Sequence, residues 1–94
     1  MSAVERAYAA ADAWRALAEA AQDALAEAGS AANALTSNNR GAAVEAFERT
    51  WRALADPAFG GSLPRLVHEC ALLAERCEQY AVRSAEAQCE AAGY

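Results

Sequence analysis

The fold of this chain is decided over residues 36–51, which read TSNNRGAAVEAFERTW. The first part is a polar turn. Asn38 and Asn39 tolerate left-handed backbone angles and can cap a helix with their side-chain oxygens. Gly41 lets the backbone bend or lets a neighbouring element approach closely. The turn therefore predicts the hinge of a helical hairpin.

An amphipathic helix follows the turn. Val44, Phe47, Trp51 and Leu54 recur at spacings of three, four and three, which places them on one stripe of a helix. We expect this second helix over residues 41–55. It ends at Asp56-Pro57, because the residue before a proline is pushed out of the helical region.

A long Ala-rich helix is expected before the turn, over residues 2–35. Ser2 and Glu5 have the spacing of a capping box at its start. Its apolar stripe continues past Gly29, although a glycine costs a helix interior about 1 kcal/mol relative to Ala.

The third helix is expected over residues 62–91, with Pro64 in its first turn, where a missing N–H is harmless. The 56–62 segment leaves two architectures open. A kink would carry helices two and three together back along the first helix, with the end of the third overhanging and Tyr80 and Ala81 left for a partner. A reversal would give a compact three-helix bundle. We expect the kink, and we expect Phe59 to pack its ring against the hairpin.

Composition predicts an all-α protein with few bulky core residues. The chain has 94 residues and is 55% hydrophobic, and its commonest residue is Ala, the best helix former. We expect one domain, residues 1–94. Its buried apolar surface is too small to offset the conformational entropy lost on folding by a safe margin. The hairpin should therefore pair into a four-helix-type bundle, either with itself or with a helical partner protein. Its buried core and interface anchors are expected to be Trp14, Leu17, Leu25, Phe47, Trp51, Leu54, Leu66, Leu73 and Tyr80.

Charge and hydropathy exclude several classes of partner. The net charge is −5, and the eight basic residues are scattered arginines with no stripe that could follow a phosphate backbone, so no nucleic acid is expected. Acidic residues interrupt every apolar run before it could span a bilayer, so no membrane insertion is expected. The N-terminus lacks the layout of a signal peptide, so we expect a cytoplasmic location, and another route must carry the protein if it leaves the cell.

No catalytic, metal or cofactor site is expected. His68 is the only histidine, and no second titratable group is set against it. Cys70 and Cys77 are two turns apart on one helix, about 10 Å by helix rise, which is too far for a disulfide. Both are expected to act as small buried hydrophobes. Cys89 lies off their stripe, which leaves open an intermolecular disulfide. The glutamates fall on polar helix faces near arginines, as in Glu48 and Arg52.

The order of a long helix, a turn with Gly and then Gly-x-Ala-x-x-Ala-Phe resembles the WxG (ESAT-like) family of small type VII (ESX) secretion proteins. Gly41, Ala43, Ala46 and Phe47 match the family's positions, and the signature Trp position is Asn39. The chain is also similar to the helical N-terminal modules of type VII-linked toxins. The resemblance covers essentially the whole chain.

The resemblance implies a non-catalytic partner protein that homo- or heterodimerises and acts as a small secreted partner, chaperone or targeting factor for a larger effector or toxin. It also implies a late Tyr-x-x-x-acid export signal. The best candidate here starts at Tyr80 and has Ser84 in place of the acid. Export as a complex would then rely on a signal from the partner. The alternative is a cytosolic helical regulatory or immunity-type binding protein that is not itself exported.

Overall fold

The structure is a computed structural model, and it describes residues 2–93 of the chain. Its helices are α1 (Ala3–Asn38), α2 (Ala42–Ala55) and α3 (Ser62–Ala91), with a short 3-10 helix η1 (Pro57–Phe59) between α2 and α3. No strand occurs in the described part, so the predicted all-α class is confirmed. The ends of the expected domain, Met1 and Tyr94, lie outside the described residues.

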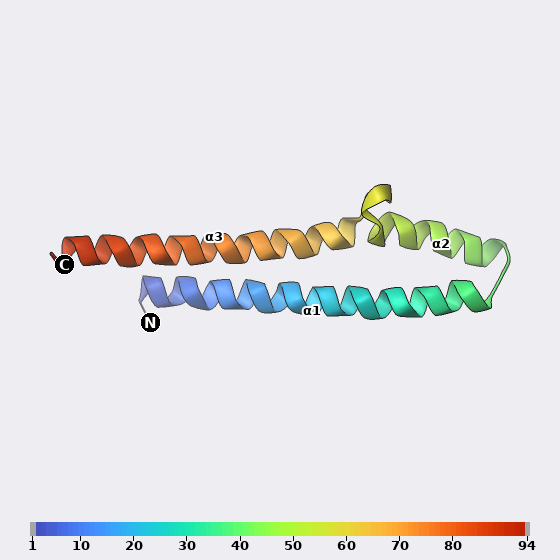
Figure 1. Cartoon of the computed structure of the whole chain (residues 1–94), viewed down its shortest axis with the longest axis horizontal. Helices are drawn as coiled ribbons and strands as arrows, with labels where there is room; N and C mark the ends of the chain where they lie inside the picture. The colour runs from blue at the N-terminus through green and yellow to red at the C-terminus, as the bar shows by residue number, and fades with distance from the viewer. Residues whose placement is uncertain (1, 94) are drawn as a thin grey trace. The chain divides into compact units, whose positions relative to one another are not determined.

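The contacts divide the chain into two compact units, and α1 and α3 each contribute to both. Unit 2 comprises residues 19–68: the later part of α1, the turn, α2, η1 and the first turns of α3. Within this unit α2 and the start of α3 both run antiparallel to α1 (Figure 1). The break therefore kinks the second arm of the hairpin, as expected, and does not reverse it.

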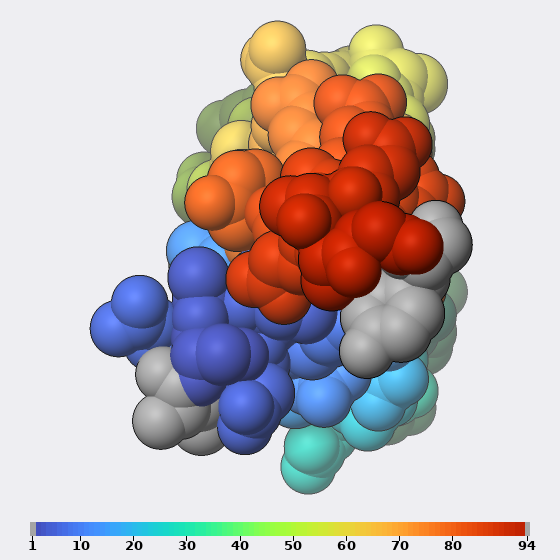
Figure 2. Space-filling view, turned by 90° about the vertical axis from the view of Figure 1, so that its left-hand side faces the viewer, coloured from blue at the N-terminus to red at the C-terminus, as the bar shows by residue number. Residues whose placement is uncertain are grey.

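Unit 1 comprises residues 1–18 and 69–94. Its described parts are the first half of α1 and most of α3, which lie antiparallel (Figure 1) and in contact when viewed from the end (Figure 2). The last turns of α3 extend past the first residue of α1, as the kinked form predicts. Ala81, however, is 0% exposed, so the expectation that it would be left for a partner is wrong. It is one of the small residues of α3 that face α1.

The start of α1 is a capping box, as predicted. The Glu5 backbone N–H donates to Ser2 Oγ at 3.1 Å, and the Ser2 N–H donates to Glu5 Oε1 at 3.4 Å. These reciprocal bonds satisfy two donors that a helix start leaves unpaired. The helix then passes through Gly29 without a break.

The turn differs from the sequence-based expectation. α1 continues to Asn38, three residues beyond the predicted end. Among the described residues only glycines have positive φ, so neither asparagine is left-handed. The Asn39 side-chain amide donates to the Leu35 carbonyl at 2.9 Å and so satisfies an acceptor at the end of α1. Gly41, with φ 122°, precedes α2 and provides no side-chain cap.

The break between α2 and α3 is held locally. The Asp56 carboxylate accepts a 2.9 Å hydrogen bond from the Ala58 N–H, and Gly61 follows with φ 49°. η1 projects from unit 2 on the side away from α1 (Figure 1). Phe59 is 59% exposed, so the expectation that its ring packs against the hairpin is wrong. The ring instead lies beneath the Arg52 guanidinium, whose carbon is 5.9 Å from the ring centroid.

Candidate interaction surface

The side chains buried inside the chain are small. Within residues 2–93, the buried apolar residues are only alanines and one cysteine: Ala7, Ala11, Ala18, Ala32, Cys70, Ala74 and Ala81. Small side chains let two helices approach closely, but each removes little apolar area from water. The core of the isolated chain is therefore close-packed but buries little apolar area.

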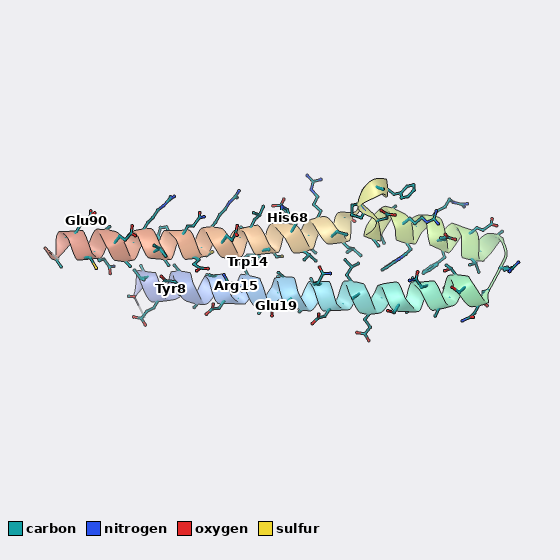
Figure 3. All side chains as sticks on the ribbon, in the orientation of Figure 1. Tyr8, Trp14, Arg15, Glu19, His68 and Glu90 are labelled. Carbon is teal, nitrogen blue, oxygen red and sulfur yellow. The ribbon has the colours of Figure 1, made fainter. Side chains whose placement is uncertain are left out.

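The nine predicted anchors mostly lie outside this core. Trp14, Leu25 and Trp51 are half-buried. In Figure 3, Trp14 points from α1 toward α3. The other six are exposed by between 36% and 60% of their surface: Leu17, Phe47, Leu54, Leu66, Leu73 and Tyr80. Their expected burial does not occur within a single copy of the chain.

The exposed anchors of α2 and α3 share one position in the helical repeat. Each lies three residues after an inward-facing residue, as Leu73 follows Cys70 and Tyr80 follows Cys77. Residues three apart on a helix are displaced sideways by about 60°. Within each unit these anchors therefore lie on one flank of the second arm: Phe47, Leu54 and Leu66 in unit 2, and Leu73 and Tyr80 in unit 1.

α1 has a matching row, of which the sequence-based prediction included only Leu17. Its members also lie three residues after inward-facing residues, as Leu17 follows Trp14 and Leu35 follows Ala32. This row is almost entirely alanine, so its spacing of three and four is hard to separate from the general Ala content of α1. It comprises Ala10, Leu17, Ala24, Ala28 and Leu35, with Ala13, Ala20 and Ala31 beside them.

In unit 2 the two rows border one groove. Its lining is wholly apolar and comes from both helices: Ala21, Ala24, Leu25 and Ala28 of α1, and Leu63, Leu66 and Val67 of α3. Because α2 and α3 both run antiparallel to α1, Phe47 and Leu54 lie on the same side of unit 2 as Leu66. We call this side, with its row on α1, the apolar face of unit 2.

Unit 1 has an equivalent apolar face. There a groove runs between Ala3, Arg6 and Ala7 of α1 and Leu73, Arg76, Cys77 and Tyr80 of α3. An ion pair from Arg15 Nη2 to Glu78 Oε2, at 2.7 Å, joins the two helices of this unit. Both partners lie on flanks of their helices that do not line this groove.

The turn residues carry no chemistry of their own. Ala43, Ala46 and Phe47 are exposed on α2, and Gly41 has open space around its α-carbon. Of the candidate export signal, Tyr80 is 60% exposed, while Ser84 is half-buried against unit 1.

The described residues offer no constellation for catalysis or metal binding. No group of three or more His, Cys, Asp or Glu residues within 2–93 could hold a metal ion. His68 is exposed, on the side of α3 away from α1 (Figure 3). The cysteines are free, with Cys70 buried, Cys77 half-buried and Cys89 exposed. The predicted pair of Glu48 and Arg52 forms on the surface of α2.

A second groove in unit 2 lies on the other flank of the hairpin. Its lining mixes Trp51 and Ala32 with polar groups, and Asn33, Thr36 and Asp56 are among them. Within residues 2–93, no helix combines the length and hydropathy required to cross a bilayer.

Comparison with known proteins identifies the family of this helical hairpin. A family model described as a WXG100-like domain matches residues 4–91. No curated protein and no solved structure matches the chain. Proteins of the matching family are small, helical and associated with type VII secretion. Because the match spans nearly the full length, from the first turn of α1 to the end of α3, the chain belongs to the WXG100-like family.

Proposed function

We propose that this protein is a non-catalytic partner protein of type VII secretion, which works by pairing its apolar faces with those of another helical hairpin. The single observation that carries the proposal is the mismatch between its core and its surface. Six of the nine large anchors are exposed, whereas the buried apolar residues of the described chain are alanines and a cysteine.

The physical cost of leaving these side chains in water supports pairing. Fully burying a Leu or Phe side chain is worth about 1.5–3 kcal/mol, and five anchors of the second arm still expose 36–60% of their surface. Monomeric proteins rarely expose such a contiguous apolar surface unless it binds something. A second hairpin packed on these anchors would turn each face into the core of a four-helix bundle.

The role that follows is to cover the apolar surface of the paired protein, keep it soluble and present the joint surface to the secretion machinery. Ser84 stands where an acid would complete the export signal after Tyr80. The complex is therefore expected to leave the cytoplasm by a signal on the paired protein.

The test compares two exposed apolar residues that lie on different flanks of α3. Leu73 lies on the apolar face, and Val82 lies beside Glu75, Glu78 and Glu86 on another flank. Leu73→Ser should raise the dissociation constant of the complex several-fold, since Leu73 is 36% exposed and burying this remaining surface is worth about 0.5–1 kcal/mol. Val82→Ser should leave the dissociation constant unchanged, because Val82 is 40% exposed and lies outside the apolar face.

Sedimentation equilibrium provides the readout, and circular dichroism checks that both variants keep their helicity. Equal effects of the two substitutions on association would contradict the proposed face. Pairing itself would be contradicted by a wild-type chain that is a cooperatively folded monomer, if the Leu73→Ser variant has the same free energy of unfolding and the same solubility.

A further inference from the structure

The groove of unit 1 differs from that of unit 2 in its charge. The unit 2 groove is lined by apolar residues alone. The unit 1 groove combines apolar walls with two exposed arginines, Arg6 of α1 and Arg76 of α3. Within residues 2–93 no acidic side chain lines this groove and neither arginine forms an ion pair, although the chain has a net charge of −5. Two positive charges therefore border one apolar groove, one from each arm of the hairpin.

These two arginines also lack the acidic neighbours that the other helical arginines have. Residues three and four apart are neighbours on the surface of a helix. Arg6 has Ser or Ala at those positions, and Arg76 has Leu, Gln or Tyr. Every other arginine within α1, α2 and α3 has an acidic residue there: Arg15, Arg49, Arg52, Arg65 and Arg83. The two arginines without an acidic neighbour on their own helix are thus the two that line the groove.

The chemistry of the groove suits a carboxylate surrounded by apolar side chains. A guanidinium is planar and weakly hydrated, and its donors match the two oxygens of a carboxylate, so arginine is the cation best suited to an interface. Leu73 and Tyr80 on the wall are 36% and 60% exposed and can cover the apolar neighbours of such an acid. A helix without the acid would take water from both arginines and give no opposite charge in return.

We propose that Arg6 and Arg76 make the unit 1 groove selective for a helix that carries a side-chain carboxylate among its apolar residues. This inference rests on the proposed function and deepens it, because it states which charge the paired hairpin must present to unit 1. The apolar wall supplies affinity for apolar helices in general, and the two arginines discriminate against helices that lack the acid. The requirement is the same for a second copy of this chain and for a different protein.

Two synthetic peptides serve as probes for this selectivity. Each is an amphipathic helix of about 20 residues with a stripe of Leu and Ala, and the two differ only by Glu or Gln at the centre of the stripe. The Glu peptide should bind the wild-type chain about fivefold more tightly, since one carboxylate between two exposed arginines gains about as much as two surface ion pairs. The difference should decrease in high salt. Titration calorimetry measures both dissociation constants.

Variants of the chain assign the difference to the two arginines. The double variant Arg6→Gln with Arg76→Gln should bind both peptides equally. Arg65→Gln is the matched control, because it removes the same charge from α3 at a position that lines neither groove and has Glu69 four residues away. This control should keep the fivefold difference. Equal binding of the two peptides to the wild-type chain, or a difference that the double variant keeps, would overturn the selectivity.

Failure of this inference is distinguishable from failure of the proposed function. Equal binding of the two peptides that Leu73→Ser weakens alike would leave the apolar face as a pairing surface and remove only the role of the arginines. Binding of neither peptide would overturn the selectivity as well, and the effect of Leu73→Ser on the complex would then decide the pairing separately. Leu73→Ser gives this independent result because it removes apolar area and keeps both arginines.

Discussion

At the scale of single residues, the fully buried apolar side chains of residues 2–93 are all small, whereas the large ones are half-buried or exposed. The inward-facing Trp14 and Trp51 are half-buried, and positions three residues after inward-facing ones on the second arm are exposed Phe, Leu or Tyr. A sequence stripe of apolar residues does not separate these roles, because both rows satisfy the helical period. From the sequence the large apolar residues were therefore predicted as one set, without a distinction between half-buried and exposed positions, and the alanine row of α1 was not included.

Gly29 provides a stability prediction at this scale. A Cβ built at this position would lie 3.9 Å from Trp51 Cζ2, which is ordinary van der Waals contact. Gly29→Ala should therefore stabilise the protein by about 0.5–1 kcal/mol through the higher helix propensity of Ala. Urea unfolding followed by circular dichroism measures this change, and a loss of stability would show that the Trp51 ring has no room for the methyl group.

Gly61 should respond in the opposite way. Its φ is 49°, and an added Cβ would lie 2.8 Å from the Pro57 Cα, a backbone atom that cannot move aside cheaply. Gly61→Ala is expected to cost about 2 kcal/mol or more, from the left-handed backbone and the clash together. Gly93→Ala is the matched control, because Gly93 also has a positive φ, 79°, but has nothing within 4 Å of the added atom. A smaller loss for Gly61→Ala than for the control would contradict the tight turn.

At the scale of elements, the helix bounds were predictable where local chemistry sets them. The start of α1 is determined by Ser2 with Glu5, and the end of α2 by Asp56 with Pro57. Both helix ends lie within one residue of the prediction. The end of α1 was predicted too early, because Asn39 caps that helix through its amide nitrogen and not the next helix through its oxygen. Both uses suit an asparagine, and its residue type alone does not choose between them.

The pairing of Arg15 with Glu78 was not predictable from local spacing, since the partners are 63 residues apart. Both side chains remain roughly half-exposed, at 46% and 49%. A double-mutant cycle with Arg15→Ala and Glu78→Ala should therefore give a coupling of about 0.5 kcal/mol that decreases in high salt. Coupling above about 2 kcal/mol would mean that the pair is shielded from water in the functional assembly.

At the scale of the whole molecule, the proposed function treats the chain as half of a larger core. The family match and the kinked second arm agree with the hairpin that the sequence predicted. The partner could not be predicted in the same way, because apolar periodicity reports that a face is buried and not by what.

Pairing between copies is tested first by the solution mass of the wild-type chain, measured by light scattering behind a sizing column over a wide concentration range. We expect twice the mass of the 9.8 kDa chain, with full helicity on the same sample. A cooperatively melting monomer that stays monomeric at high concentration would contradict self-pairing, because the exposed anchors would then need no partner.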